Sequence, residues 1–367
     1  MNYLPLYVGV ACLSSYYLWS KLMTARRRAA FSKAHGCQPI RQLPQSPFFF
    51  GFDTVFLFQK LLKDGVFMDT STKWFEENGG TFCMRMGGGK PVWTRDPENV
   101  KAALASKAED FDIPWMRIKA FYPVTGDSAF SSKGAVWSHG RALLRPAFTK
   151  LQISNFDIYE KNFQKFSKHI PSDGSTVDLQ ELFKRFTLDT TSEILFGESV
   201  NSLDSNVTTK DISNAFDYVS KEIFARSNLG LLIFIYWDSK FTYACKVLDA
   251  YIKEFVDKAV NFRASAKAIE DEEGQPSGKK RYIFLEELAK DTSDRKLLRD
   301  QLAGNLAAGR DTTAGLLTNT FWLLARHANA LQTLRTEVAQ LNGKLPTYDQ
   351  LNSMTYLRWV LNESKLA

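Results

Sequence analysis

The chain has 367 residues, of which 44% are hydrophobic, so it is long enough to enclose one large core or two domains. Its net charge of +7 is concentrated at the N-terminus. Six of the 47 basic residues and none of the acidic residues precede Asp53, whereas the rest of the chain contains 41 basic and 40 acidic residues. This nearly neutral body excludes the basic surface of nucleic-acid-binding proteins, so no nucleic-acid partner is expected.

Residues 1–22 are predicted to form a transmembrane anchor. The first 20 carry no charge, and about 20 apolar residues suffice to span a bilayer. Tyr16, Tyr17 and Trp19 occupy the place of an interfacial aromatic belt, and the basic residues that follow indicate a single-pass protein with its body in the cytosol. A cleavable signal peptide, which carries its charge before the apolar run, and a buried helix are the alternatives.

A basic, proline-bearing linker is predicted over residues 23–48, because prolines stiffen a chain and prevent regular structure. The body of the protein then begins at residue 49. Its first element is a helix expected over Val55–Asn78, a stretch rich in Phe and Leu.

A β-hairpin is predicted over residues 81–96, with its turn at Gly87–Gly89. Lys90 is followed by Pro91 and not by Ser or Thr, which excludes a phosphate-binding P-loop. The pair Asp96-Pro97 then predicts a helix start, because Asp caps the first turn and Pro is preorganised for it.

From about Trp137 onward the pattern is almost entirely helical, which predicts a mainly α fold. The charged stretch 263–281 is expected to be a solvated loop. The apolar run Leu229–Trp237 is too short to span a membrane, so it is either a buried segment between helices or a segment that dips into the bilayer. A long central helix is expected over Leu297–His327.

Small residues interrupt this central helix. Gly304, Ala308, Thr312 and Gly315 share one face by their spacing, which gives a strip with little side-chain bulk. The Thr312 hydroxyl is expected to bond the carbonyl of Ala308, and beside Asp311 it forms a candidate proton-delivery site. Close packing of a second helix on the strip is the alternative.

The cysteines and histidines are scattered along the chain and show no metal-ligand spacing. Neither a disulfide framework nor a protein-bound metal ion is therefore predicted. The cysteines are Cys12, Cys37, Cys83 and Cys245, and the histidines are His35, His139, His169 and His327.

Two motifs resemble those of the cytochrome P450 family, the haem-thiolate monooxygenases. Residues 308–313, AGRDTT, are similar to the oxygen-activation motif on the long central helix of that family. Trp137 and Arg141 match its Trp-x-x-x-Arg motif, and the segment 144–148, LRPAF, follows as it does there.

Four further segments resemble the fungal microsomal branch that hydroxylates n-alkanes and fatty acids. They are HGCQP at 35–39, FGFDTVF at 50–56, FTLDTTSEILFGESV at 186–200 and AGRDTTAGLL at 308–317.

This resemblance implies the N-terminal portion of the P450 fold, with a small N-terminal sheet, in residues 49–367. It also implies haem b as cofactor and electrons from NADPH through a reductase. A hydrophobic small molecule and O2 would be the substrates. The endoplasmic reticulum membrane would be the location, with the body on the cytosolic side.

The resemblance also assigns roles around the central helix. Asp311 and Thr312 would be catalytic, with the Thr312 hydroxyl relaying protons during oxygen activation and Asp311 as the carboxylate behind that relay. Ala308 and Gly309 would bind the cofactor where the helix passes close over the porphyrin.

The remaining assignments lie before the central helix. Trp137, His139 and Arg141 would hold the haem propionates, because a guanidinium fork suits a carboxylate. Phe121 and Phe130 are candidates for an apolar substrate pocket, although ordinary core packing is the alternative for each.

One part of the family pattern is missing from the sequence. Glu363 fits the first position of the family's Glu-x-x-Arg motif, but Leu366 stands at the Arg position. None of the four cysteines lies in the family's haem-ligand loop, so the thiolate that holds the iron is absent. We therefore expect a fragment that is inactive as written. A non-catalytic, membrane-anchored product of a pseudogene or of mis-splicing is the alternative.

Overall fold

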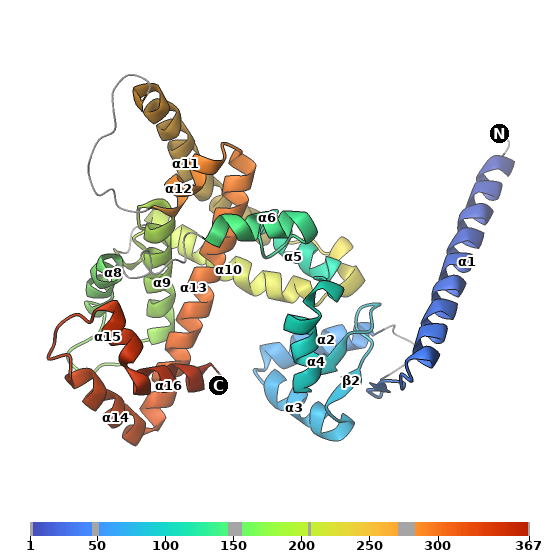
Figure 1. Cartoon of the computed structure of the whole chain (residues 1–367), viewed down its shortest axis with the longest axis horizontal. Coiled ribbons are helices and arrows are strands. Elements are labelled where there is room, and N and C mark those ends of the chain that lie inside the picture. The colour runs from blue at the N-terminus through green and yellow to red at the C-terminus, as the bar shows by residue number, and fades with distance from the viewer. Residues whose placement is uncertain (1–2, 46–50, 146–155, 205–206, 271–282, 366–367) are drawn as a thin grey trace. The chain divides into compact units, whose positions relative to one another are not determined.

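The structure is a computed structural model that describes residues 3–45, 51–145, 156–204, 207–270 and 283–365. It divides into two compact units, Met1–Asp110 and Phe111–Ala367 (Figure 1). This division falls inside the region 49–367 that the sequence predicts as one domain, and the predicted domain limits stay a prediction.

The first unit contains a three-stranded sheet in the order β1-β2-β3. Strand β1 (Arg41–Gln42) pairs in parallel with β2 (Thr81–Cys83), which pairs antiparallel with β3 (Val92–Thr94). Its helices are α1 (Leu4–Ala34), α2 (Phe52–Lys63), α3 (Phe67–Asn78) and α4 (Pro97–Lys101), followed by the π-helix η1 (Ala102–Ser106) and the 3-10 helix η2 (Ala108–Asp110).

The predicted hairpin is confirmed, with Phe82 opposite Trp93. The predicted helix over Val55–Asn78 is wrong in its continuity. It is two helices, α2 and α3, separated at Gly65, whose φ of +70° is a conformation that stops a helix and favours glycine. The predicted cap is confirmed, since the Asp96 side chain accepts hydrogen bonds from the first-turn N–H groups of Glu98 and Asn99.

The predicted transmembrane anchor is not supported. Within the described residues, no helix is both long enough and apolar enough to cross a membrane. Helix α1 does not end at residue 22 but continues to Ala34, so it carries Arg26, Arg27 and Arg28 of the predicted linker on the same helix.

The second unit is built around helix α13 (Arg295–Arg326), which confirms the predicted central helix. The helices before it are α5 (Trp115–Thr125), α6 (Gly134–Leu144), α8 (Asp157–Ser167), α9 (Leu179–Phe196), α10 (Val207–Ser227), α11 (Ser239–Glu270) and α12 (Phe284–Asp291), with the 3-10 helices η4 (Ser202–Asp204) and η5 (Gly230–Phe234). Three helices follow it: α14 (Ala328–Ala339), α15 (Tyr348–Ser353) and α16 (Thr355–Ser364).

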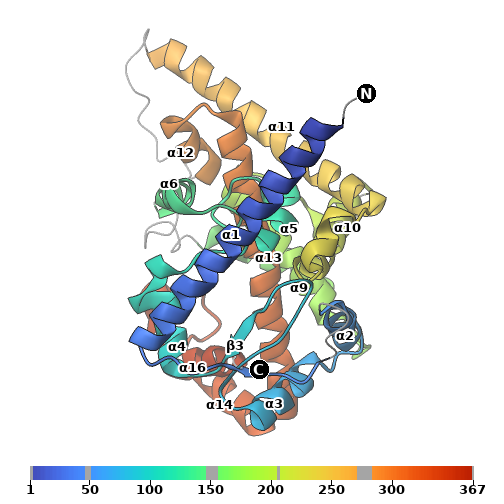
Figure 2. The same cartoon turned by 90° about the vertical axis from the view of Figure 1, so that its right-hand side faces the viewer.

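Most of the other helices of this unit pack on α13. Helix α9 runs along it most extensively, and α5, α11, α12, α14 and α16 also contact it (Figures 1 and 2). The main hydrophobic core contains buried side chains from these helices and from α10. They include Leu188, Phe216, Leu248, Leu298 and Leu302. The unit is therefore mainly α, as predicted.

One predicted loop has the wrong bounds, and one of the two alternatives for the apolar run Leu229–Trp237 does not hold for the whole run. The predicted loop 263–281 begins too early, because α11 continues through Glu270; residues 271–282 lie outside the described residues. The stretch Leu229–Trp237 is not a buried segment as a whole. Gly230 and Ile233 are buried, but Ile235 and Trp237 are 80% and 78% exposed.

Glycine 309 sets the distance between α9 and α13. A Cβ at this position would lie 2.7 Å from the Thr191 side chain on α9, closer than a real Cβ contact allows. Because Gly309 has no side chain, the backbones of α9 and α13 can approach each other closely at this position. Gly309 therefore has a role in the packing of these two helices.

We expect Gly309→Ala to destabilise the protein by about 1–3 kcal/mol, the usual cost of inserting a methyl group into a well-packed core. Gly315→Ala is the matched control, because no atom lies within 4 Å of its would-be Cβ and Ala favours a helix by about 0.5–1 kcal/mol. Urea unfolding of both variants measures the difference. Equal unfolding midpoints would contradict the close contact.

Candidate active site

One face of α13 stays uncovered around Thr312. The Thr312 side chain is exposed, and its hydroxyl donates to the Ala308 carbonyl at 2.7 Å, as the sequence predicted. A Cβ built at Gly315, one turn further, would meet nothing within 4 Å. Ala308, Thr312 and Gly315 therefore form a shallow face of small side chains, which we call the open face.

The predicted strip is shorter than the sequence indicated. At Gly304 a Cβ would lie 2.8 Å from the Ser128 side chain and 3.3 Å from the Phe130 ring, so the loop before α6 covers this end. Gly309 does not belong to the open face either, because its bare side meets Thr191 of α9. Its predicted part in binding the cofactor stays a prediction.

Arg310 is the largest fully buried side chain of the described residues, with 1% of its surface exposed. One guanidinium nitrogen lies 2.7 Å from Asp217 of α10, and another lies 2.8 Å from Asp311. The Thr187 hydroxyl of α9 donates to the Arg310 carbonyl at 3.0 Å. A buried cation is tolerated only when it is paired in this way.

These contacts fix the predicted catalytic carboxylate. Asp311 accepts one bond from Arg310 and another from the Ser220 hydroxyl of α10. It is directed toward α10, while Thr312 beside it lies on the open face.

The sequence analysis missed Arg310, Asp217 and Ser220 as determinants of the site. A basic residue in the middle of a largely apolar helix was the available signal for Arg310, since such a charge requires a partner. No comparable signal marked the two residues of α10.

Helix α6 carries the other predicted cofactor-binding residues. Gly140 faces α13, where its Cβ would lie 2.8 Å from the Gln301 side chain. Trp137, His139 and Arg141 are exposed, and Arg141 makes no ion pair with any described residue. Residues 146–148 of the second motif lie outside the described residues.

The two phenylalanines proposed for a substrate pocket differ in their surroundings. Phe121 packs against the main core, and the Arg117 guanidinium lies 5.0 Å from its ring centre. These surroundings are those of ordinary core packing. Phe130 lies next to Gly304, one turn before Ala308, and is the phenylalanine that borders the open face.

These residues fit a haem group. The open face offers a surface of small side chains, and Arg141, which forms no ion pair with the described residues, offers a guanidinium fork of the kind that binds carboxylates. In the described part of the chain, no group of His, Cys, Asp and Glu residues could hold a metal ion. The four cysteines are free thiols.

The cytochrome P450 family profile matches residues 47–364. The chain belongs to the cytochrome P450 family. Cytochromes P450 use haem iron and electrons that a reductase supplies from NADPH. The chain is similar to the cytochrome P450 monooxygenase fsdH of Fusarium heterosporum, with 36% identity over 96% of this chain, and spans 63% of the length of that protein.

Other relatives support the same assignment. Cytochrome P450 52A13 of Debaryomyces hansenii is 33% identical over 96% of this chain and 69% of its own length. The crystal structure of the cytochrome P450DA heme domain superposes with a TM-score of 0.64 and 19% identity, over 89% of this chain and 69% of that one. This structural likeness shows the fold of this P450 chain and nothing further.

We expect Arg310→Lys to destabilise this P450 chain by about 2 kcal/mol, because a single ammonium group cannot reproduce a fork that serves two carboxylates. Arg326→Lys on the same helix is the control, since Arg326 is exposed and such changes stay within about 0.5 kcal/mol. Urea unfolding monitored by far-UV circular dichroism compares them. An Arg310→Lys variant as stable as the control would show that the fork is not needed.

Proposed function

We propose that the protein is a haem-dependent monooxygenase that hydroxylates long-chain alkanes or fatty acids. The observation that carries this proposal is the open face of α13, with the Thr312 hydroxyl exposed on it next to the fixed carboxylate of Asp311. The substrate class rests on the resemblance of four segments to the fungal alkane- and fatty-acid-hydroxylating branch.

The haem would lie against the open face at Ala308 and Thr312. Arg141 would hold a propionate through its guanidinium fork, with Trp137 and His139 beside it on α6. When bound, the haem supplies the activation of dioxygen that oxidises an apolar C–H bond.

Thr312 is suited to move a proton at its Oγ1 atom. At rest this hydroxyl donates to the Ala308 carbonyl, and rotation about χ1 would redirect the same O–H toward a ligand on the open face. Asp311 stays in place because Arg310 and Ser220 hold its two oxygens, and it would be the carboxylate behind the threonine in the proton relay.

Phe130 contributes an apolar border to the open face, which would exclude water and favour a hydrophobic substrate. Phe121 is left out of this role because it packs into the core.

Association with the endoplasmic reticulum membrane and with an NADPH-dependent reductase belongs to the same proposal. Two apolar surfaces support contact with a bilayer. On α1, Leu13, Leu18 and Trp19 are each more than half exposed and lie next to the basic run. In the second unit, Ile235 and Trp237 are exposed beside η5, which favours the bilayer alternative for that stretch.

A second candidate function is a non-catalytic, membrane-associated product. The observation in its favour is that Leu366 stands where the family's Glu-x-x-Arg motif has Arg, three residues after Glu363. Turnover separates the two candidates, because only the first consumes oxygen and NADPH in the presence of reductase.

We expect Thr312→Ala, assayed with haem, reductase, NADPH and a long-chain alkane or fatty acid, to keep consuming oxygen while forming several-fold less hydroxylated product. The reason is that loss of the hydroxyl removes the proton donor on the open face. The measurement is the ratio of product formed to oxygen consumed.

Thr318→Ala is the matched control, since Thr318 makes the same type of bond, to the Ala314 carbonyl at 2.8 Å, on the same helix. Unchanged coupling in Thr312→Ala would remove Thr312 from this role. No oxygen consumption by the unmodified protein would favour the non-catalytic candidate.

A further inference from the structure

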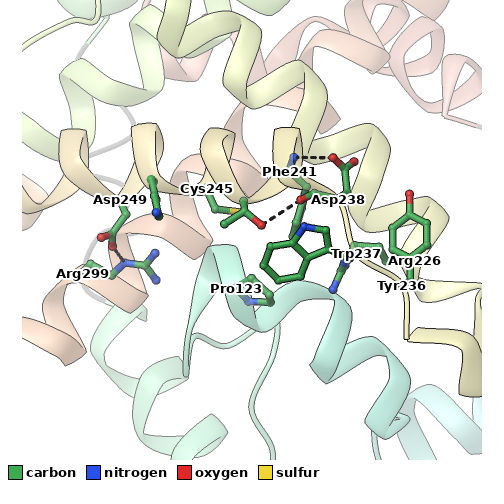
Figure 3. A pocket seen from close by; sticks show the side chains of 11 residues that line it. Pro123, Arg226, Tyr236, Trp237, Asp238, Phe241, Cys245, Asp249 and Arg299 are labelled. Atoms are coloured by element: carbon green, nitrogen blue, oxygen red, sulfur yellow. Dashed lines mark hydrogen bonds and ion pairs between the residues drawn. The ribbon is translucent and has the colours of Figure 1, made fainter. Parts of the chain in front are cut away.

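A hollow of about 400 Å³ lies between α5, α10, α11 and α13, apart from the open face (Figure 3). Its volume is within the range of small-molecule sites. Figure 3 shows Trp237 and Pro123 at its middle, Arg226 and Tyr236 at one end, and the Arg299–Asp249 ion pair at the other.

Arg226 lines this hollow and forms no ion pair with a carboxylate among the described residues. Its guanidinium lies 5.7 Å from the ring centre of Tyr236 and 4.6 Å from that of Phe241, and this stacking holds it in position. Its Nε atom is buried and has no hydrogen-bond partner in the described part of the chain. A buried donor without a partner raises the free energy of the folded protein. A ligand that accepts a hydrogen bond from this Nε atom would remove that penalty.

The two carboxylates of the hollow are already engaged elsewhere. Asp238 accepts bonds from the Tyr218 hydroxyl at 2.6 Å and from the backbone N–H of Lys240 at 2.8 Å, and the Tyr218 bond is the main cause that lowers its pKa. Asp249 is paired with Arg299 and with Lys253, each at 2.8 Å. Neither carboxylate forms an ion pair with Arg226.

The thiol and the phenol that line the hollow, Cys245 and Tyr236, are neutral at pH 7. Burial raises the pKa of the Cys245 thiol to about 11, and burial is also the first cause that raises the pKa of Tyr236 to about 12. Lys246 adds an exposed ammonium group at the rim. Among the side chains that line the hollow, the cations Arg226, Lys246 and Arg299 outnumber the carboxylates Asp238 and Asp249. Glu222 of α10 adds a carboxylate behind Tyr236, with which it shares a hydrogen bond.

We propose that this hollow binds an organic monocarboxylate with an apolar body. The carboxylate would take both donors of the Arg226 fork, and the apolar body would lie against Trp237 and Pro123. Arg299, which lines the hollow, precedes Thr312 by 13 residues on α13, about 20 Å along the helix axis, so this site is separate from the open face.

Binding to the full chain is measured by equilibrium dialysis with decanoate and benzoate as probes and decanol as the uncharged analogue. We expect Arg226→Gln to weaken binding of the preferred acid at least tenfold, and Arg226→Lys to weaken it less because the charge remains. Arg335→Gln, an exposed site on α14, is the control and should leave binding unchanged. Preference for decanoate assigns the site to an alkanoate, and preference for benzoate assigns it to an aromatic acid.

Equal binding of decanoate and decanol, or equal binding by Arg226→Gln and the unmodified chain, would overturn the proposal. If Arg226→Gln fails to fold, the comparison of decanoate with decanol and the Arg226→Lys variant decide the question. The assay involves no turnover, so its failure would be distinguishable from failure of the monooxygenase proposal.

Discussion

The buried guanidinium of Arg310 is the constraint on which the second unit depends. A cation at that depth costs several kcal/mol unless it is paired, and its carboxylate partners in the described structure are Asp217 of α10 and its neighbour Asp311. Helix α10 must therefore present Asp217 to the middle of α13. Because Gly309 also brings α9 into contact with the same turn, α9 and α10 cover two sides of the helix, and the side with Ala308 and Thr312 stays open.

Much of the fold could be predicted from the sequence because its signals are local. The hairpin over 81–96 and the cap at Asp96 depend on neighbouring residues and were placed correctly. The break at Gly65 was missed because a glycine within an apolar helical pattern marks a break only when its φ is positive, which the sequence does not state. The end of α11 at Glu270 was missed because charge alone does not exclude a helix.

The contacts of the site that could be predicted are those between residues that lie close together in the sequence. The bond from Thr312 to Ala308 follows from helix geometry and was anticipated. The direction in which Gly309 and Asp311 face depends on Thr191 and Ser220, which lie more than 90 residues earlier in the chain. Such long-range partners leave no periodic pattern in the sequence, so the contact of Gly309 with α9 could not be predicted.

A double-mutant cycle at Arg310 and Asp217 tests this account most directly. The free energy of unfolding in urea is measured for Arg310→Met, Asp217→Ala and the double variant. If the ion pair sets the position of α10 against α13, the double variant should be less destabilised than the sum of the single variants by about 1.5 kcal/mol or more, as expected for residues in one buried network. Effects that add to within about 0.5 kcal/mol would contradict the account, because they would show that the two residues do not depend on each other.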